Sequence, residues 1–236
     1  MDTISELQIP YEDMLASGMH FGRKKTVFNP RMEPYVYTVR DGICIIDLLK
    51  TQIQLKNTAE FLKKTIQNGG LVLFVALTKQ STESVKELAI SLNQPYVVDR
   101  WIGGTLTNFK VINARVRKLE EMEKDLKAGK FDKYTKKERL MLTREMAKMS
   151  MHFEGLKKLI RMPDVVFVSS QKESELPVHE AKLAKVNIVA ITNTDADPNQ
   201  VNYAIPANDR SKKSVDLIIG ALNKELTNVT NISWTS

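Results

Sequence analysis

The chain has 236 residues, of which 42% are hydrophobic and 27% are charged, so it is long enough for one sizeable core with an appended module. Its net charge of +7 and its pI of about 9.3 predict an anionic partner. One cysteine excludes an internal disulfide, no apolar run approaches the roughly 20 residues that cross a bilayer, and the N-terminus has neither signal-peptide nor transit-peptide composition, so we expect a cytosolic protein.

A short helix is predicted over 11–17, where a glycine follows the apolar residues. The next segment, 19–31, places cations between aromatic and turn residues, and its Asn29-Pro30 pair argues against a helix. We interpret this segment as an irregular basic loop that lies along a phosphate backbone. A solvated loop held in place by its aromatic side chains is the alternative.

An Asp-Gly pair at 41–42 separates two apolar stretches, 34–39 and 43–48, and this pattern predicts a β-hairpin. Cys44 lies in the second stretch, where its apolar neighbours predict a small core residue. An amphipathic helix is predicted over 49–67, because a polar Asn-Gly-Gly sequence closes its apolar periodicity.

Beyond residue 70, short apolar strands alternate with helical patterns, which predicts a layered α/β fold with a mostly parallel sheet. The run 71–77 carries almost no polar residue, as expected of a strand that is buried on both faces. The other predicted strands span 96–99, 164–168, 188–191 and 203–205. The predicted helices span 85–92, 176–185 and 213–226.

Residues 105–161 interrupt this alternation with two apolar stripes at helical spacing. Thr135 and Glu138 match a capping box for the second helix, so we expect an antiparallel coiled-coil hairpin. The stripes comprise Leu106, Phe109, Ile112, Val116, Leu119, Met122 and Leu126, then Leu142, Met146, Met149, Phe153, Leu156 and Ile160. The predicted domains are therefore a discontinuous body (1–104 and 162–226), the hairpin insertion (105–161) and a flexible tail (227–236).

The junction between body and hairpin contains two consecutive glycines, Gly103 and Gly104, which predict a tight turn. Thr105 or Thr107 is predicted to cap the first hairpin helix, since a hydroxyl there accepts a bond from an unpaired backbone N–H. Trp101 either stacks on a base or anchors the junction by burial, and we favour burial.

Positive charge is concentrated in the hairpin. Between Lys110 and Arg161 there are sixteen Lys and Arg against eight Asp and Glu, a net charge of +8 that leaves −1 for the rest of the chain. A second group of cations lies between Arg23 and Arg40. A solvated coiled coil is the alternative, but an excess this large favours a surface that faces phosphates.

Enzyme signatures are weak. The sequence contains neither a G-x-G-x-x-G pattern nor a P-loop, and its cysteine and histidines do not lie at metal-ligand spacing. His152 is interpreted as a flank residue of the hairpin, and His179 as a surface or cap residue.

Carboxylates follow two predicted strands at the end where α/β sheets usually bind ligands. These are Asp195 and Asp197 after one strand and Asp209, beside Asn208, after the next. Turn and helix-cap chemistry explains the same residues, and we favour that explanation. The rival functions are therefore an α/β enzyme that binds an anionic substrate here and a coiled-coil adaptor that binds only protein.

Six blocks, in order along nearly the whole chain, resemble the bacterial-type ribosomal protein S2 family of the small ribosomal subunit. They are MLASGMHFG at 14–22, NPRMEPY at 29–35, RWIGGTLTN at 100–108, FDKYTKKE at 131–138, PDVVFV at 163–168 and IPAND at 205–209. The family usually has a second histidine after His-Phe-Gly, where this chain has Arg23, and this departure weakens any metal role for His20.

The resemblance implies a flavodoxin-like, mostly parallel sheet with the coiled-coil hairpin inserted. It also implies a structural, non-enzymatic protein on the solvent side of the small subunit, between head and body. Its expected partners are small-subunit rRNA, neighbouring ribosomal proteins and the mRNA-binding ribosomal protein S1, which it helps to recruit. No catalytic residue, metal or cofactor is expected.

We expect rRNA binding by basic side chains, aided by Asn108 at the start of the hairpin. The candidates near the N-terminus are Arg23, Lys24, Lys25, Arg31 and Arg40. The candidates on the hairpin are Lys110, Arg115, Arg117, Lys118, Lys136, Lys137 and Arg139.

Overall fold

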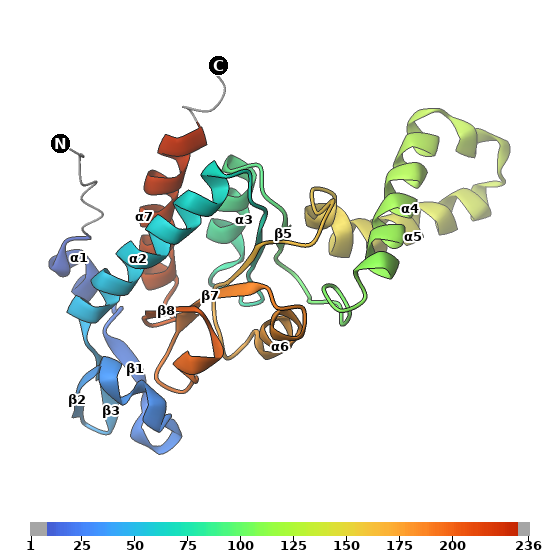
Figure 1. The fold of residues 1–236 in the computed structure, drawn as a ribbon. Helices are drawn as coiled ribbons and strands as arrows, with labels where there is room; N and C mark the ends of the chain where they lie inside the picture. Colours follow the sequence, from blue (N-terminus) through green and yellow to red (C-terminus); the bar gives the residue numbers. More distant parts are fainter. Residues whose placement is uncertain (1–8, 231–236) are drawn as a thin grey trace.

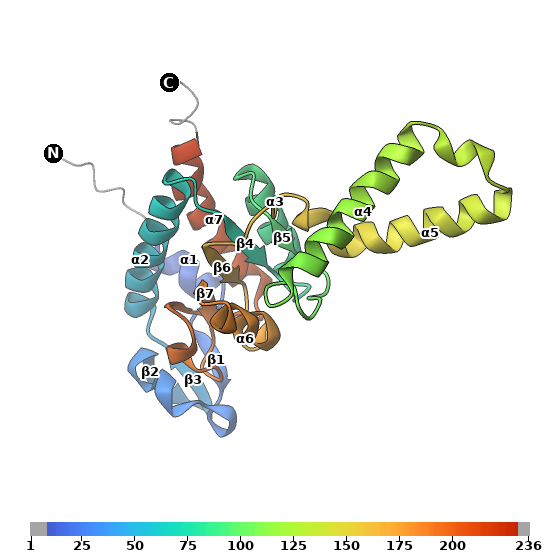
Figure 2. The same cartoon turned by 45° about the vertical axis from the view of Figure 1, so that its right-hand side comes forward.

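The computed structural model describes residues 9–230 (Figure 1). A parallel sheet with helices on both faces forms the body, a small antiparallel sheet lies at one end of it, and a two-helix arm projects from another side (Figures 1 and 2). Residues 1–8, which we assigned to the body, and residues 231–236 of the predicted tail lie outside the described part.

The five strands of the body are all parallel and follow the order β5-β4-β6-β7-β8. They span Val72–Val75 (β4), Tyr96–Val97 (β5), Val165–Val168 (β6), Asn187–Thr192 (β7) and Tyr203–Pro206 (β8). Strands β4 and β6 are buried along their whole length, as their uninterrupted apolar sequences predict. This strand order is the doubly wound, flavodoxin-like order, so the predicted fold class is confirmed.

Alternate residues of the strands enter two different cores. Val72, Phe74 and Phe167 pack with helices α2, α3 and α7 on one face, whereas Leu73 and Val166 pack on the other face with α6 and the root of the arm. The helices span Leu48–Gln67 (α2), Thr82–Ser91 (α3), Glu175–Leu183 (α6) and Lys212–Thr230 (α7). Helix α7 therefore continues past residue 226, where we expected it to end.

The N-terminal region begins with helix α1, Tyr11–Ala16, and continues into a three-stranded antiparallel sheet of order β1-β3-β2. Its strands span Phe21–Lys24 (β1), Val36–Arg40 (β2) and Ile43–Ile46 (β3). The predicted hairpin is confirmed, since Asp41 and Gly42 both have positive φ (52° and 75°), as the tight turns of hairpins require. Cys44 is buried, as expected.

The prediction of an irregular loop over 19–31 is wrong for its first part. Residues Phe21–Lys24 form strand β1, which pairs with β3, although β2 lies between them in the sequence. Short 3-10 turns follow at Lys25–Val27 and Pro30–Tyr35. The strand was missed because its pairing partner comes later in the chain, so the local turn residues gave no sign of it.

The arm consists of helices α4, Phe109–Lys127, and α5, Lys136–Phe153, joined through a 3-10 turn at Lys130–Lys133. It leaves the body after β5 and returns through a 3-10 turn at Glu154–Leu156 before β6 (Figure 2). Its root lies in the same apolar cluster as α6 and the sheet. None of the described helices is long and apolar enough to span a bilayer.

Candidate nucleic-acid interface

The second arm helix starts at the capping box that the sequence predicted. The backbone N–H and the hydroxyl of Thr135 both donate to Glu138 Oε2, at 2.9 and 2.8 Å, and the Glu138 N–H donates back to Thr135 Oγ1 at 3.4 Å. These bonds satisfy donors that a helix N-terminus leaves open, and they lower the pKa of the Glu138 carboxyl.

Apolar packing between the two arm helices is concentrated near the body. Ile112, Val116 and Leu119 are buried on α4, whereas Met146 on the facing helix is only partly buried. Toward the tip the helices separate (Figure 2), and Leu126 is exposed although it belongs to the predicted stripe. The buried side chains of α4 extend to Met122, beyond which the helices diverge, and Phe131 is buried in the turn at the tip.

The predicted stripe of the second helix also ends early. Helix α5 stops at Phe153, so the periodicity shifts at the following 3-10 turn. As a result Leu159 is buried, and Ile160, which we placed in the stripe, is 78% exposed.

The predicted RNA-binding cations of the arm lie on its surface. Residues 110 and 117 are one heptad apart on the side of α4 opposite the buried stripe, since the helix turns by about 100° per residue. The exposed members of the set are Asn108, Lys110, Arg115, Arg117, Lys118, Lys136, Lys137 and Arg139. Lys118 also forms a cross-helix ion pair with Glu145 at 2.9 Å, and both side chains are largely exposed.

A second exposed cationic group lies on the small sheet. Lys24 on β1 and Arg40 on β2 both align with Ile43 of the central strand, so their strands bring them to the same end. Lys25 follows directly and donates its backbone N–H to Gly42 in the hairpin turn. Lys24, Lys25 and Arg40 are all exposed, and we call these three residues the turn cluster.

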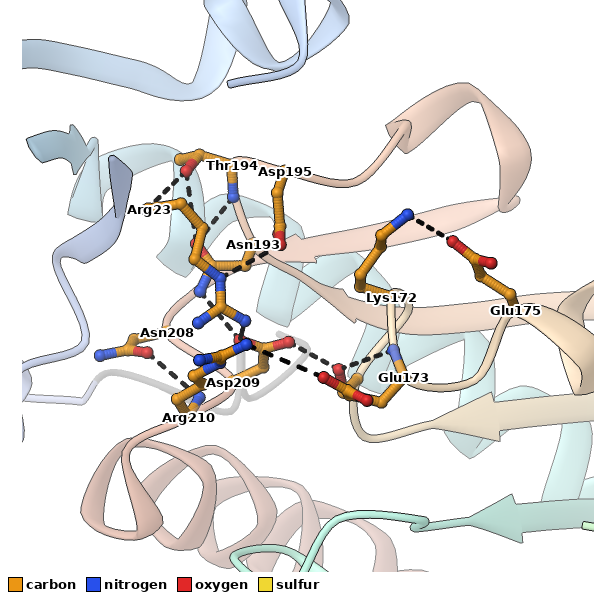
Figure 3. Close-up of polar contacts among 11 residues, drawn as sticks. Arg23, Lys172, Glu173, Glu175, Asn193, Thr194, Asp195, Asn208, Asp209 and Arg210 are labelled. Atoms are coloured by element: carbon orange, nitrogen blue, oxygen red, sulfur yellow. Dashed lines mark hydrogen bonds and ion pairs between the residues drawn. The ribbon is translucent and has the colours of Figure 1, made fainter. Parts of the chain in front are cut away.

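Arg23 differs from the other candidates because its guanidinium is turned inward (Figure 3). Nε donates to Asp195 at 3.2 Å and Nη2 donates to Asp209 at 3.1 Å, and the Arg23 side chain is only 12% exposed. The Arg23 backbone N–H also donates to the Thr194 hydroxyl at 2.7 Å. These contacts join strand β1 of the small sheet to the carboxyl ends of β7 and β8.

Asp209 is the most buried of these acids. Its oxygens also accept hydrogen bonds from the Ser170 hydroxyl at 2.6 Å and from the Asn193 amide at 2.8 Å. Gly22 fits tightly at the same place, since a Cβ there would lie 2.6 Å from the Thr194 side chain and 2.8 Å from a backbone oxygen. The glycine before Arg23 thus permits the small sheet to approach β7.

The carboxylates that suggested an enzyme site are engaged by cations. Asp195 and Asp209 pair with Arg23, and Asp197 pairs with Arg31, whose side chain is 62% exposed. Asp197 also accepts the Asn199 backbone N–H at 3.0 Å, which confirms the predicted turn chemistry. Among the side chains that the structure describes, no group of three or more His, Cys, Asp and Glu could hold a metal ion.

The expectation that Asn208 or Asp209 caps the last helix is wrong. Asp209 is occupied by Arg23, Ser170 and Asn193, and the Asn208 side chain accepts from the Arg210 N–H within a turn. The Ser211 hydroxyl instead accepts the Ser214 N–H at 3.4 Å at the start of α7.

At the arm's junction, Trp101 is 5% exposed, so its predicted burial is confirmed. The predicted helix cap is wrong. The Thr105 hydroxyl donates to the Ile102 carbonyl at 2.6 Å, and the Thr107 hydroxyl donates to Glu180 at 3.2 Å, while Asn108 occupies the N-cap position. Gly104 has a φ of +91°, which fits the predicted tight turn.

Glu180 is a buried carboxylate that the sequence analysis did not select. The nearby His179 is exposed, as expected. Burial of Glu180 tends to raise its pKa, but hydrogen bonds from Trp101 and the junction backbone outweigh burial and lower it. The available signal was an acidic residue between the apolar residues Val178 and Ala181 on a core-facing helix.

Comparison with known proteins identifies the family of this fold and its arm. The family model described as ribosomal protein S2 matches residues 14–228. The chain therefore belongs to the ribosomal protein S2 family.

Several curated relatives are named small ribosomal subunit protein uS2. The protein from Parabacteroides distasonis is 38% identical, with 91% of this chain and 77% of the relative covered. The protein from Arthrobacter sp. is 40% identical, with 89% and 72% covered, and that from Bdellovibrio bacteriovorus is 39% identical, with 89% and 67% covered. As a member of this family, the chain is a structural component of the cytoplasmic small ribosomal subunit in translation, and it is not an enzyme.

Proposed function

We propose that the chain binds small-subunit rRNA through the exposed cations of the arm and of the turn cluster. The observation that carries this proposal is the set of exposed lysines and arginines on the arm, because residues 110–161, which contain the arm and its return connection, carry a net charge of +8 while the rest of the chain carries −1. Double-helical RNA hides its base edges in a deep groove, so contacts to phosphates and 2′-hydroxyls dominate such binding.

Lys136 and Lys137 test the proposal because both are exposed in the first turn of α5. The double variant K136A/K137A should weaken binding to small subunits that lack this protein. Each lost phosphate contact should reduce the salt slope of log K by roughly 0.7–0.9. The measurement is co-sedimentation with such subunits over a salt series.

A matched control removes the same charge from the body. Lys56 and Lys64 are exposed on α2, on the side of the body away from the arm (Figure 1). The double variant K56A/K64A should keep the wild-type slope. If K136A/K137A also keeps the full slope, those lysines do not contact phosphate. If binding of the wild-type chain is itself insensitive to salt, an adaptor that binds only protein is favoured.

We also propose that the chain helps to recruit the mRNA-binding ribosomal protein S1, which is supported by the family resemblance. Subunits reconstituted without this chain should then retain less S1 after sedimentation than subunits that contain it. Equal retention would contradict this second proposal and leave the first intact.

A further inference from the structure

We propose that Glu180 is a positioning residue that sets the direction in which the arm leaves the body. Glu180 lies on α6, is 3% exposed, and accepts five hydrogen bonds, all from the segment 101–107. That segment is the outgoing connection between the sheet and α4. One side chain of the body therefore holds the chain at the point where the arm begins.

The two carboxylate oxygens divide the donors between the two ends of the segment. Oε1 accepts from the Trp101 indole N–H and the Gly104 N–H, each at 2.9 Å. Oε2 accepts from the Leu106 N–H at 3.0 Å, the Thr107 N–H at 3.3 Å and the Thr107 hydroxyl at 3.2 Å. Because the donors converge on one rigidly placed group, the backbone path of the segment is defined over its whole length.

Every one of these donors is neutral, so the charge of Glu180 is stabilised by hydrogen bonds instead of an opposite charge. A buried carboxylate that loses such bonds is strongly destabilised, so the hydrogen bonds hold the segment firmly against α6. Apolar contacts support it, since Trp101 and Leu106 share a core cluster with Val178 and Ala181 of α6.

The return connection of the arm is also held against the body. A Cβ at Gly155 would lie 2.2 Å from the Tyr96 carbonyl oxygen of β5, so the returning chain touches the sheet edge directly. His152, near the end of α5, lies 3.4 Å from Asp99. With the return fixed at β5, the hydrogen bonds of Glu180 decide how the outgoing helix is oriented.

The experiment measures the arm's orientation in the free full-length chain. Spin labels at E60C on α2 and A128C at the arm tip, in a C44A background, report the distance between body and tip by pulsed electron resonance. The isosteric variant E180Q removes the charge and turns an amide N–H₂ toward backbone donors. We expect its distance distribution to broaden at least about twofold while the chain stays folded.

The control variant E175Q makes the same charge change on the same helix, at an exposed position. It should keep the wild-type distribution. An unchanged distribution in folded E180Q overturns the proposal. If E180Q does not fold, the double variant W101F/T107A removes two side-chain donors and keeps the carboxylate. It should then broaden the distribution, and an unchanged distribution in it overturns the proposal equally.

The inference matters for function only if the arm binds RNA, and to that extent it rests on the proposed function. The two fail separately, because the distance measurement involves no RNA. A broadened distribution in E180Q together with a full salt slope in K136A/K137A would retain the positioning role and reject the RNA contact at the tip.

Discussion

Two buried carboxylates in this protein are stabilised by different means. Asp209 pairs with the Arg23 guanidinium at 3.1 Å, whereas Glu180 accepts hydrogen bonds from an indole, a hydroxyl and backbone N–H groups. Removal of either partner destroys an ion pair. Removal of one of several neutral donors weakens the stabilisation of the carboxylate only in part. Among the arginines near the small sheet, we therefore expect Arg23 to contribute most to the free energy of unfolding.

The variant R23A should lower the free energy of unfolding by about 3–5 kcal/mol, because it leaves the charge of Asp209 buried and unpaired. R23K should lie between R23A and the wild type, since an ammonium group cannot contact both acids in the same fork geometry. Urea unfolding monitored by circular dichroism measures the difference.

The control for this prediction is R31A. The Arg31 side chain is 62% exposed, so loss of its ion pair with Asp197 should cost no more than about 1 kcal/mol. Equal destabilisation by R23A and R31A would contradict the internal role of Arg23. A reduced salt slope of RNA binding in R23A, at a temperature where this variant is folded, would show that Arg23 contacts phosphate as well.

At the scale of elements, the arm depends on how its two connections pass the body. The outgoing chain needs the turn at Gly104, and the returning chain needs the absence of a side chain at Gly155. Helix α4 buries apolar side chains from Ile112 to Met122, whereas α5 buries only Phe153, at its root end. The root, more than helix–helix packing at the tip, therefore sets the arm's stability.

Replacing Gly155 with alanine tests the returning connection. The added Cβ would meet both the Tyr96 carbonyl oxygen and its ring, so G155A should cost about 1–3 kcal/mol through overpacking. G103A is the matched control, because a Cβ there has no atom within 4 Å and φ is not positive. We expect G103A to change stability by at most about 1 kcal/mol. Similar losses in both would show that the junction is strained by any alanine.

At the scale of the whole molecule, the two cationic regions lie on different sides of one body. The small sheet with the turn cluster is at one end, and the arm extends from another side (Figures 1 and 2). A body held together by a buried ion pair and by a core on each face of the sheet presents both regions in a fixed relation, so each should contribute independently to binding.

Independent contribution predicts additive losses. K24A/K25A and K136A/K137A should each weaken binding to small subunits lacking this protein, and the fourfold variant should lose the sum of the two free energies within about 0.5 kcal/mol. Affinity measured at one fixed salt concentration checks this. A combined loss much smaller than the sum would mean that the two regions do not bind RNA at the same time.

Much of the architecture could be predicted because it depends on local pattern. An apolar run such as Val165–Val168 predicts a buried strand from its own composition. The Thr135–Glu138 capping box and the Asp41-Gly42 turn depend only on residues that are close in sequence. The exposed cations of the arm were predictable for the same reason, since helical periodicity separates them from the apolar stripe.

The contacts that join these elements depended on residues far apart in the chain. Arg23 meets Asp209 across 186 positions, and Glu180 meets the junction across 73 to 79. A local sequence pattern can suggest that such a residue is buried or at a strand end, but it does not say which distant residue will be its partner. Local propensity thus set the strands, helices and charged faces, whereas tertiary packing alone turned Arg23 inward and gathered five donors onto Glu180, since only a closed core makes an unpaired polar group costly.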